Sequence, residues 1–312
     1  MAGQLHVIFG TGPLGKSVMR PLVAQGERVR MVNRSGTADV PAGVEVCADD
    51  AYNVEAVKRL TEGAAVVYQC AQPEYHEWVD KFPAMQAAIL EGTAANGAKL
   101  VLGDNLYSYG ETNGVPMTEE TPWKPNSRKG AVRAAMARAG LDAHKSGKLP
   151  VAIVKGSDFF GSHDHLSGDR YFYPAIAGKQ VSGFGSLDQP HTVTYIDDFG
   201  LAMATVGAHD DAYGQVWHVP SAPAVTQGQF IRLVFEAAGS PAKVGGISKL
   251  MMRMAGLFIR PAREVIEMMY QFEKPFIMDS SKFTKRFGIE ATPLRQAVAE
   301  SVAWFRAHPK TK

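Results

Sequence analysis

The stretch "LHVIFGTGPLGKSVM", residues 5–19, decides the fold of this chain. It joins an apolar run typical of a buried β-strand to the start of a helical pattern. Between the two, the glycines follow the spacing G-x-G-x-x-G. In such a strand–turn–helix unit the first glycine permits a tight turn, the second admits a pyrophosphate, and the third allows close helix packing. The helix N-terminus then faces the anion. The stretch predicts a dinucleotide-binding unit whose cofactor loop is Gly10, Thr11, Gly12, Pro13, Leu14 and Gly15.

The rest of the first half alternates short apolar runs with longer helical patterns. This alternation is typical of βα units, and nearly continuous apolar strands indicate a parallel sheet covered by helices on both faces. We therefore predict an α/β fold with a doubly wound parallel sheet (Rossmann). The expected strands are residues 5–10, 28–34, 44–49, 64–71, 99–105 and 151–159.

After Gly161 the pattern becomes irregular and rich in Gly, Pro, His and aromatic residues. We predict a dinucleotide-binding domain over residues 1–160, with its sheet completed by about 191–220. A smaller, mainly helical substrate domain is expected from 161–190 and 221–312. In open α/β folds the ligand binds at the carboxyl ends of the strands, so we expect it between the two domains.

Composition limits the partners that we expect. The 312 residues include 33 basic and 31 acidic side chains with no long block of one sign, which argues against a nucleic-acid partner. The most apolar late stretch, "LMMRMAGLFI" at 250–259, contains Arg253 and is too short to span a bilayer. Cys47 and Cys70 are expected as two buried thiols in a reducing compartment. We therefore expect a cytoplasmic monomer or homodimer that acts on a small molecule, without a membrane partner.

The end of the second expected strand, "VNRSG", bears on the choice of cofactor. Asn33 and Arg34 stand where NAD-selective sites carry a carboxylate for the ribose hydroxyls. An arginine there would instead pair with the 2′-phosphate, so we predict NADP(H). The alternative is a surface arginine at a strand end.

Two further strand ends provide candidates for the cofactor path. Asp49 could accept a hydrogen bond from the adenine amino group, although a carboxylate at this position also serves as a helix cap. Ala71 and Gln72, in "CAQ", end the fourth expected strand beside the path of the dinucleotide.

The motifs follow one another in an order that can be compared with that of a known family over nearly the whole chain. "GTGPLG", "VNRSG", "GDNLYSYG", "PNSRKGAVRAAM", "VKGSDFFG" and "HTVTYIDD" together resemble the extended short-chain dehydrogenase/reductases, the NAD-dependent epimerase/dehydratase family. The resemblance implies a Ser or Thr after the fifth strand, then Tyr-x-x-x-Lys as the proton-transfer pair. Here Asn105 stands at the first position, and Lys129 and Arg133 stand at the Tyr and Lys positions.

The K-x-x-x-R spacing is similar to that of the isoflavone reductase-like branch, NADPH enzymes in which this lysine is assigned acid/base work. The resemblance implies that Lys129 is the catalytic acid. We expect Arg133, one turn further on, to hold the cofactor ribose and to make Lys129 a better proton donor through like-charge repulsion. The alternative is a solvated basic helix face.

Other polar residues are candidates for substrate contact. Tyr107 and Tyr109 could each polarise a carbonyl; the alternative is packing of the rings with an exposed hydroxyl, which is commoner for tyrosines. Asp158, which stands where the family's sugar-nucleotide epimerases present an asparagine, and His191 are expected to line the substrate pocket. The loop "HDH" at 163–165 matches no zinc spacing, so we expect no metal.

We predict an NADPH-dependent reductase of a small, largely apolar carbonyl or conjugated substrate. Two alternatives stay open at this point. One is an epimerase or isomerase that retains its nucleotide cofactor; the other is a non-enzymatic NADP(H) redox sensor.

Overall fold

The computed structural model describes residues 3–258 and 260–310. These residues form two compact units. Unit 1 comprises residues 3–108, 128–156 and 197–219, and unit 2 comprises 109–127, 157–196, 220–258 and 260–310.

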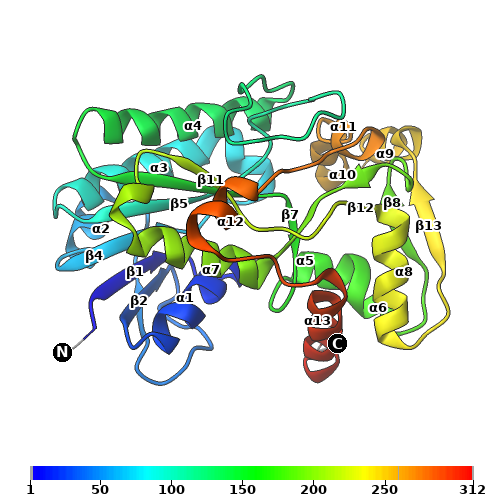
Figure 1. Ribbon diagram of the computed structural model, residues 1–312, viewed down its shortest axis with the longest axis horizontal. Coiled ribbons are helices and arrows are strands. Elements are labelled where there is room, and N and C mark those ends of the chain that lie inside the picture. The colour runs from blue at the N-terminus through cyan, green and yellow to red at the C-terminus, as the bar shows by residue number, and fades with distance from the viewer. Residues whose placement is uncertain (1–2, 259, 311–312) are drawn as a thin grey trace. The chain divides into compact units, whose positions relative to one another are not determined.

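Unit 1 is built on a parallel sheet that has seven strands within the described residues (Figure 1). The strand order is β11-β6-β5-β4-β1-β2-β3, and every neighbouring pair is parallel. This is the predicted doubly wound sheet. Its strands are β1 (Leu5–Phe9), β2 (Arg28–Asn33), β3 (Glu45–Ala48), β4 (Ala64–Gln69), β5 (Lys99–Asn105), β6 (Val151–Gly156) and β11 (Val216–His218).

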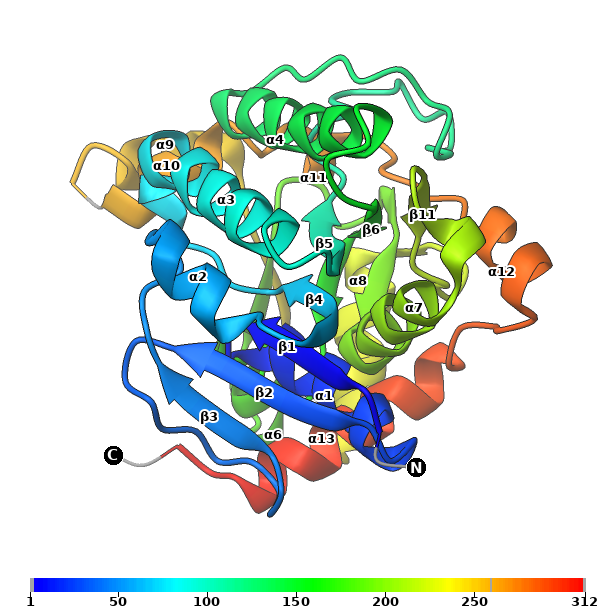
Figure 2. The ribbon, with the colours of Figure 1, turned by 90° about the vertical axis from the view of Figure 1, so that its left-hand side faces the viewer.

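Helices cover both faces of this sheet. Figure 2 shows α2, α3 and α4 on one face and α1 and α7 on the other. The helices are α1 (Pro13–Ala24), α2 (Val54–Leu60), α3 (Trp78–Ala94), α4 (Arg128–Lys145) and α7 (Ile196–Ala208), with short 3-10 turns at Tyr75–Glu77 and Asp210–Ala212. Because both faces are covered, the central strands are buried along their whole length, as in β1 and β6.

Unit 2 contains helices and, in the part of it that the structure describes, three two-stranded sheets. Its strand pairs are β7 (Asp158–Phe160) with β10 (Val193–Tyr195), β9 (Pro190–His191) with β12 (Val225–Thr226), and β8 (Val181–Phe184) with β13 (Val244–Ile247). The longer helices are α8 (Gln227–Ala238) and α13 (Leu294–Ala307). The shorter ones are α5 (His165–Ser167), a π-helical turn at Gly168–Phe172, α6 (Tyr173–Ile176), α9 (Lys249–Ala255), α10 (Arg260–Ile266), α11 (Tyr270–Glu273) and α12 (Ser281–Phe287). An aromatic core that includes Phe160, Phe172, Phe230 and Phe305 holds α8 and α13 together.

Two expectations about strands differ from the structure. The single strand expected over 151–159 is two strands, because the Ser157 amide donates to the Thr194 hydroxyl at 3.0 Å instead of continuing the ladder of β6. The strand that follows His191, β10, does not join the seven-stranded sheet, because it pairs with β7. Of the segment 191–220, the part that joins this sheet is β11, which pairs with β6.

The unit boundaries also differ from the expected domains. Residues 109–127 were expected in the first domain but belong to unit 2, where the Met117 amide donates to the Ile277 carbonyl at 2.8 Å. Both cysteines are half-buried rather than buried, because Cys47 lies on the edge strand β3 and Cys70 lies beyond the end of β4. Within the part of the chain that the structure describes, no helix is both long and apolar enough to cross a membrane.

Candidate functional site

The glycine-rich turn between β1 and α1 uses each glycine for a different reason. Gly10 has a φ of +109°, and a Cβ there would lie 2.8 Å from the Ala71 amide nitrogen. A Cβ on Gly15 would overlap the Gly10 carbonyl oxygen. Gly12 has an ordinary φ of −75°, and apart from its chain neighbours Thr11 and Pro13 no atom of the described residues lies within 4 Å of a Cβ built there. The fold therefore requires glycine at 10 and 15, whereas the open space at Gly12 is suited to the close approach of a ligand.

Asn33 connects this turn to the end of β2. Its side-chain amide donates to the Thr11 hydroxyl and to the Thr37 carbonyl, both at 2.8 Å, and its oxygen accepts from the Gly36 amide at 2.7 Å. Arg34 follows directly and is exposed. Asn33 thus shapes the loop, and Arg34 presents a positive charge beside it.

Asp49 lies one residue beyond β3. Its carboxylate pairs with Arg59 at 2.6 Å and accepts from the Asp50 amide at 2.9 Å. Ala71 abuts Gly10, and Gln72 is exposed. Asp49 would have to share its carboxylate between Arg59 and an adenine, whereas Ala71 borders the glycine turn directly.

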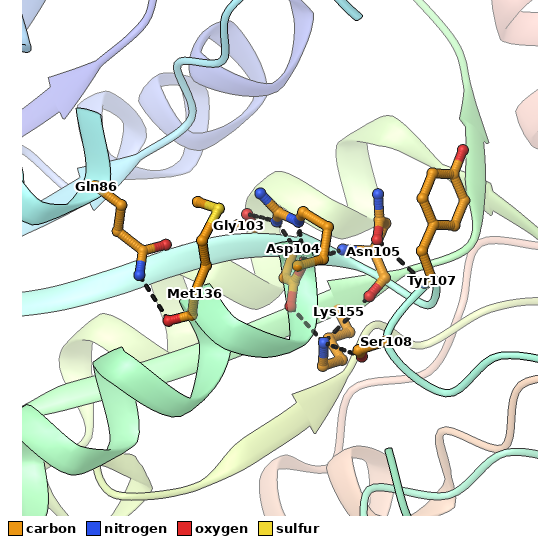
Figure 3. Close-up of polar contacts among 9 residues, drawn as sticks. Gln86, Gly103, Asp104, Asn105, Tyr107, Ser108, Met136 and Lys155 are labelled. Carbon is orange, nitrogen blue, oxygen red and sulfur yellow. Dashed lines mark hydrogen bonds and ion pairs between the residues drawn. The ribbon is translucent and has the colours of Figure 1, made fainter. Parts of the chain in front are cut away.

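A buried cluster of charges lies at the carboxyl ends of β5 and β6 (Figure 3). Asp104 is ion-paired with Lys155, which stands directly opposite it in the strand register, and with Arg133 from α4. The Arg133 Nε donates to Asp104 at 2.6 Å, and the Lys155 ammonium donates to the Ser108 hydroxyl at 3.0 Å and the Asn105 carbonyl at 3.2 Å. The cluster fixes the loop after β5 to α4.

The electrostatics of this cluster follow from its burial. Burial alone would raise the pKa of the Asp104 carboxyl, but the positive charges of Arg133 and Lys155 outweigh it and hold that pKa below its usual value. Asp104 is therefore ionised at neutral pH and compensates two buried cations.

Replacing Asp104 by asparagine is expected to destabilise the protein by about 3–5 kcal/mol, because it leaves buried cations uncompensated. The folded-state pKa of Asp104 is depressed, so its stabilisation is complete above the unfolded value of about 3.9 and is lost as pH falls through the lower folded pKa. Urea denaturation of wild type and variant across that acid range measures both effects. Asp210→Asn, which removes an exposed ion pair with Lys99, is the matched control and should change stability little. Equal stability of Asp104→Asn and wild type at neutral pH would contradict the assignment.

Lys129 and Arg133 are buried, so the alternative of a solvated basic helix face is wrong. They are 1% and 5% exposed, and they lie one turn apart at the start of α4. The Lys129 ammonium lies 4.5 Å from the centre of the Tyr75 ring. Arg133 is instead occupied by Asp104, the Gly103 carbonyl at 2.9 Å and the Phe82 ring, which favours a positioning role over the expected ribose contact.

The remaining candidates from the sequence, Asn105, Tyr107 and Tyr109, differ in their contacts and burial. The Asn105 side chain accepts from the Tyr107 amide at 3.1 Å, and the Tyr107 ring points away from the contact of Asp104 with Lys155 (Figure 3). Tyr107 is half-buried, whereas Tyr109 is 1% exposed and belongs to unit 2. Burial of Tyr109 favours the packing interpretation of its ring.

Unit 2 brings together the two expected substrate residues. The His191 Nε2 lies 3.2 Å from the Asp158 Oδ2, and the His191 Nδ1 donates to the Gln271 carbonyl at 3.1 Å. Burial alone would raise the pKa of Asp158, but the His191 imidazole and the charge of Arg170 hold it below its usual value. The Arg170 guanidinium stacks 3.8 Å above the Phe184 ring. The Asp158 carboxylate and the His191 ring are therefore held together beside a partly apolar cluster.

Two residues of the "HDH" loop, His163 and Asp164, pack against or cap neighbouring elements of unit 2. His163 stacks on Trp304 with 4.6 Å between the ring centres, and Asp164 caps α5 through the Ser167 amide at 3.0 Å. Among the described residues, no three His, Cys, Asp or Glu side chains gather as they would around a metal ion.

Asp104 and Lys155 were missed from the sequence. The available signal was a charged residue near the carboxyl end of each of two mainly apolar strands, Asp104 in "KLVLGDN" and Lys155 in "VAIVKG". A buried charge requires a partner, so two such strands in one parallel sheet predict an ion pair between them.

Residues 7–219 match the NAD dependent epimerase/dehydratase family, so the chain belongs to that family. A dTDP-glucose 4,6-dehydratase of Streptomyces griseus is 23% identical over 203 residues, which cover 64% of this chain and 56% of that protein. The chain spans about half the length of the curated relatives that it matches.

Solved structures share the fold along the whole chain. The UDP-N-acetylglucosamine 4-epimerase of Bacillus cereus has a TM-score of 0.81 at 15% identity, with 99% of each chain covered. The UDP-glucose 4-epimerase of Thermus thermophilus, solved as a complex with NAD, has a TM-score of 0.78 at 18% identity, with 98% of this chain and 99% of that chain covered. At these identities the likeness establishes the fold.

Proposed function

We propose that this protein binds a nicotinamide dinucleotide at the β1–α1 turn and uses it to reduce a small, largely apolar carbonyl or conjugated compound. The observation that carries the proposal is the open space at Gly12, a glycine that the fold itself does not require. The complex of the Thermus thermophilus epimerase with NAD supports the same class of cofactor. The loop residues 10–15 would hold the pyrophosphate, and the nicotinamide would supply the hydride.

The cofactor that we propose is NADP(H). Arg34 is exposed next to the loop that Asn33 shapes, and no carboxylate occupies residues 33–37 to repel a 2′-phosphate. A charge-assisted hydrogen bond contributes about 1.5–3 kcal/mol. Arg34→Ala is therefore expected to weaken NADPH binding by roughly 10- to 100-fold and to leave NADH binding almost unchanged. Fluorescence titration with both nucleotides measures the effect.

Arg28→Ala is the matched control for Arg34→Ala. Arg28 is also exposed, but it is the first residue of β2 and lies at the opposite end of the same strand. We expect wild-type affinities from this variant. Equal affinity of the wild-type protein for NADPH and NADH would refute the preference.

For the proton we propose Lys129, as the resemblance to the isoflavone reductase-like branch implies. The Lys129 side chain is buried beside the Tyr75 ring, and a positioned lysine is one of the side chains that can serve as a general acid. We further propose that Asp158 and His191, in unit 2, contact the substrate. An ionised Asp158 would oppose a diphosphate group, which favours a small substrate without one.

A second candidate is an epimerase or dehydratase that retains its nucleotide, as the names of the relatives suggest. The two candidates differ in the state of the purified protein. A retained cofactor, visible after denaturation and chromatography, with no net consumption of added NADPH, would support the epimerase. Purification without nucleotide, followed by NADPH oxidation with a carbonyl compound, would support the reductase.

A further inference from the structure

A stripe of exposed apolar side chains runs along α9 and the turn that follows it. Three of its members are spaced i, i+1 and i+4 on one face of α9, and the other two lie in the turn after Ala255. Such a face normally packs on a core, but here it is open to solvent. The stripe consists of Leu250 (68% exposed), Met251 (56%), Met254 (62%), Leu257 (69%) and Phe258 (90%).

The inner face of the same helix already has its partners. Met252, only 6% exposed, packs in a cluster with Met269 and Phe272. The exposed stripe is therefore a second apolar face. Single exposed apolar residues are common, but a contiguous group of this kind marks an interaction surface.

The shape of this surface is fixed by the contact of α9 with α10, which lie side by side in Figures 1 and 2. A Cβ on Gly256 would lie 2.8 Å from the Ile266 Cδ1, so glycine permits the close approach. The Arg263 Nε donates to the Gly256 carbonyl at 3.0 Å. These contacts hold the hairpin while its apolar stripe stays exposed.

The charge of the segment around the stripe is mainly positive. Residues 241–263 contain five basic side chains and no acidic one, in a chain whose 33 basic and 31 acidic residues otherwise nearly balance. The five are Lys243, Lys249, Arg253, Arg260 and Arg263, and the next acidic residues along the chain are Glu264 and Glu267. Lys249 pairs with Glu273 at 2.9 Å, which offsets part of this charge, whereas Arg253 is exposed within the stripe itself.

We propose that the α9–α10 surface, residues 249–258 and 260–266, docks on the headgroups of an anionic lipid bilayer. Exposed Leu, Met and Phe side chains would enter the boundary between headgroups and acyl chains, and the basic residues would contact acidic headgroups. With seven residues each, α9 and α10 are too short to span, so the surface lies on the membrane. The combination of an apolar stripe with mainly positive surroundings favours lipid over an acidic protein.

Co-sedimentation with vesicles tests the proposal. The protein is expected to bind vesicles of phosphatidylcholine mixed with phosphatidylglycerol, to bind pure phosphatidylcholine much more weakly, and to be released by salt. The double variant Leu257→Ser/Phe258→Ser should lower the partition coefficient about tenfold or more. Arg253→Glu should lower it by about fivefold or more.

Leu166→Ser is the matched control, because Leu166 is 79% exposed on α5, outside this surface. It should bind vesicles as wild type does, and circular dichroism should show all variants folded. Failure to bind the anionic vesicles, or equal binding by the double variant, would overturn the proposal. So would a concentration-dependent dimer that the double variant abolishes, because a second copy would then cover the stripe. The assay needs neither cofactor nor substrate, so its outcome is independent of the proposed reductase activity.

Discussion

Replacing Gly12 by valine is expected to abolish NADPH binding while leaving the protein folded. Apart from its chain neighbours, no described atom of the protein lies within 4 Å of a Cβ at position 12, and a φ of −75° is ordinary for valine. The same side chain would occupy the space that a pyrophosphate needs at the N-terminus of α1. Calorimetric titration with NADPH and circular dichroism of the same sample separate binding from folding.

Gly15→Ala provides the contrast within the same turn. Its Cβ would overlap the Gly10 carbonyl oxygen, so this variant is expected to lower the melting temperature. Gly12→Ala should fold normally and bind NADPH more weakly than wild type, since its side chain is smaller than valine. A folded Gly12→Val protein with wild-type affinity would mean that the turn is structural and the cofactor binds elsewhere.

The sheet could be predicted because its information is local. Each apolar run predicted as a strand contains one, and β5 (Lys99–Asn105) has the expected bounds. The glycine spacing fixed the β1–α1 turn because its three positions have requirements that only glycine meets together. The order of motifs identified the family, and the family match covers residues 7–219, the part of the chain that contains these motifs.

The charged cluster could not be predicted with the same ease, because it depends on strand register. Asp104 and Lys155 are 51 residues apart and meet only because β5 and β6 are neighbours with these residues opposite each other. The expected ribose role of Arg133 depended on helix spacing alone. Spacing gives the face of α4 on which the guanidinium lies, but the nearest carboxylate decides its partner.

Local side-chain hydrogen bonds caused the other differences. A strand pattern over 151–159 is continuous in hydrophobicity, but the bond from the Ser157 amide to the Thr194 hydroxyl ends the ladder. Asn33, predicted beside the cofactor, also donates to the Thr11 hydroxyl and accepts from the Gly36 amide, bonds that sequence spacing does not reveal. A polar residue at a strand end can shape the local loops through its side chain.

Lys129→Met is expected to lower the rate of hydride transfer by ~100- to 10,000-fold, the usual contribution of a general acid, while NADPH binding is retained. Lys129 is 1% exposed, lies near the start of α4, and places its ammonium 4.5 Å from the centre of the Tyr75 ring. Methionine has a similar length and no charge, so the variant is expected to keep the packing of α4. The measurement is single-turnover oxidation of NADPH with a carbonyl substrate found by screening.

Two further variants distinguish proton transfer from a requirement for positive charge at this position. Lys129→Arg keeps the positive charge, but a guanidinium does not release its proton at neutral pH. This variant should therefore be as slow as Lys129→Met. Lys145→Met, at the exposed end of the same helix, should react as wild type does.

Because Asp104 holds Arg133 in place, the first turns of α4, from which Lys129 also projects, are fixed to the end of β5 before any substrate binds. If Lys129→Met reacts within about threefold of wild type, the proton comes from another group, and Tyr107, half-buried in the loop after β5, is the next to replace.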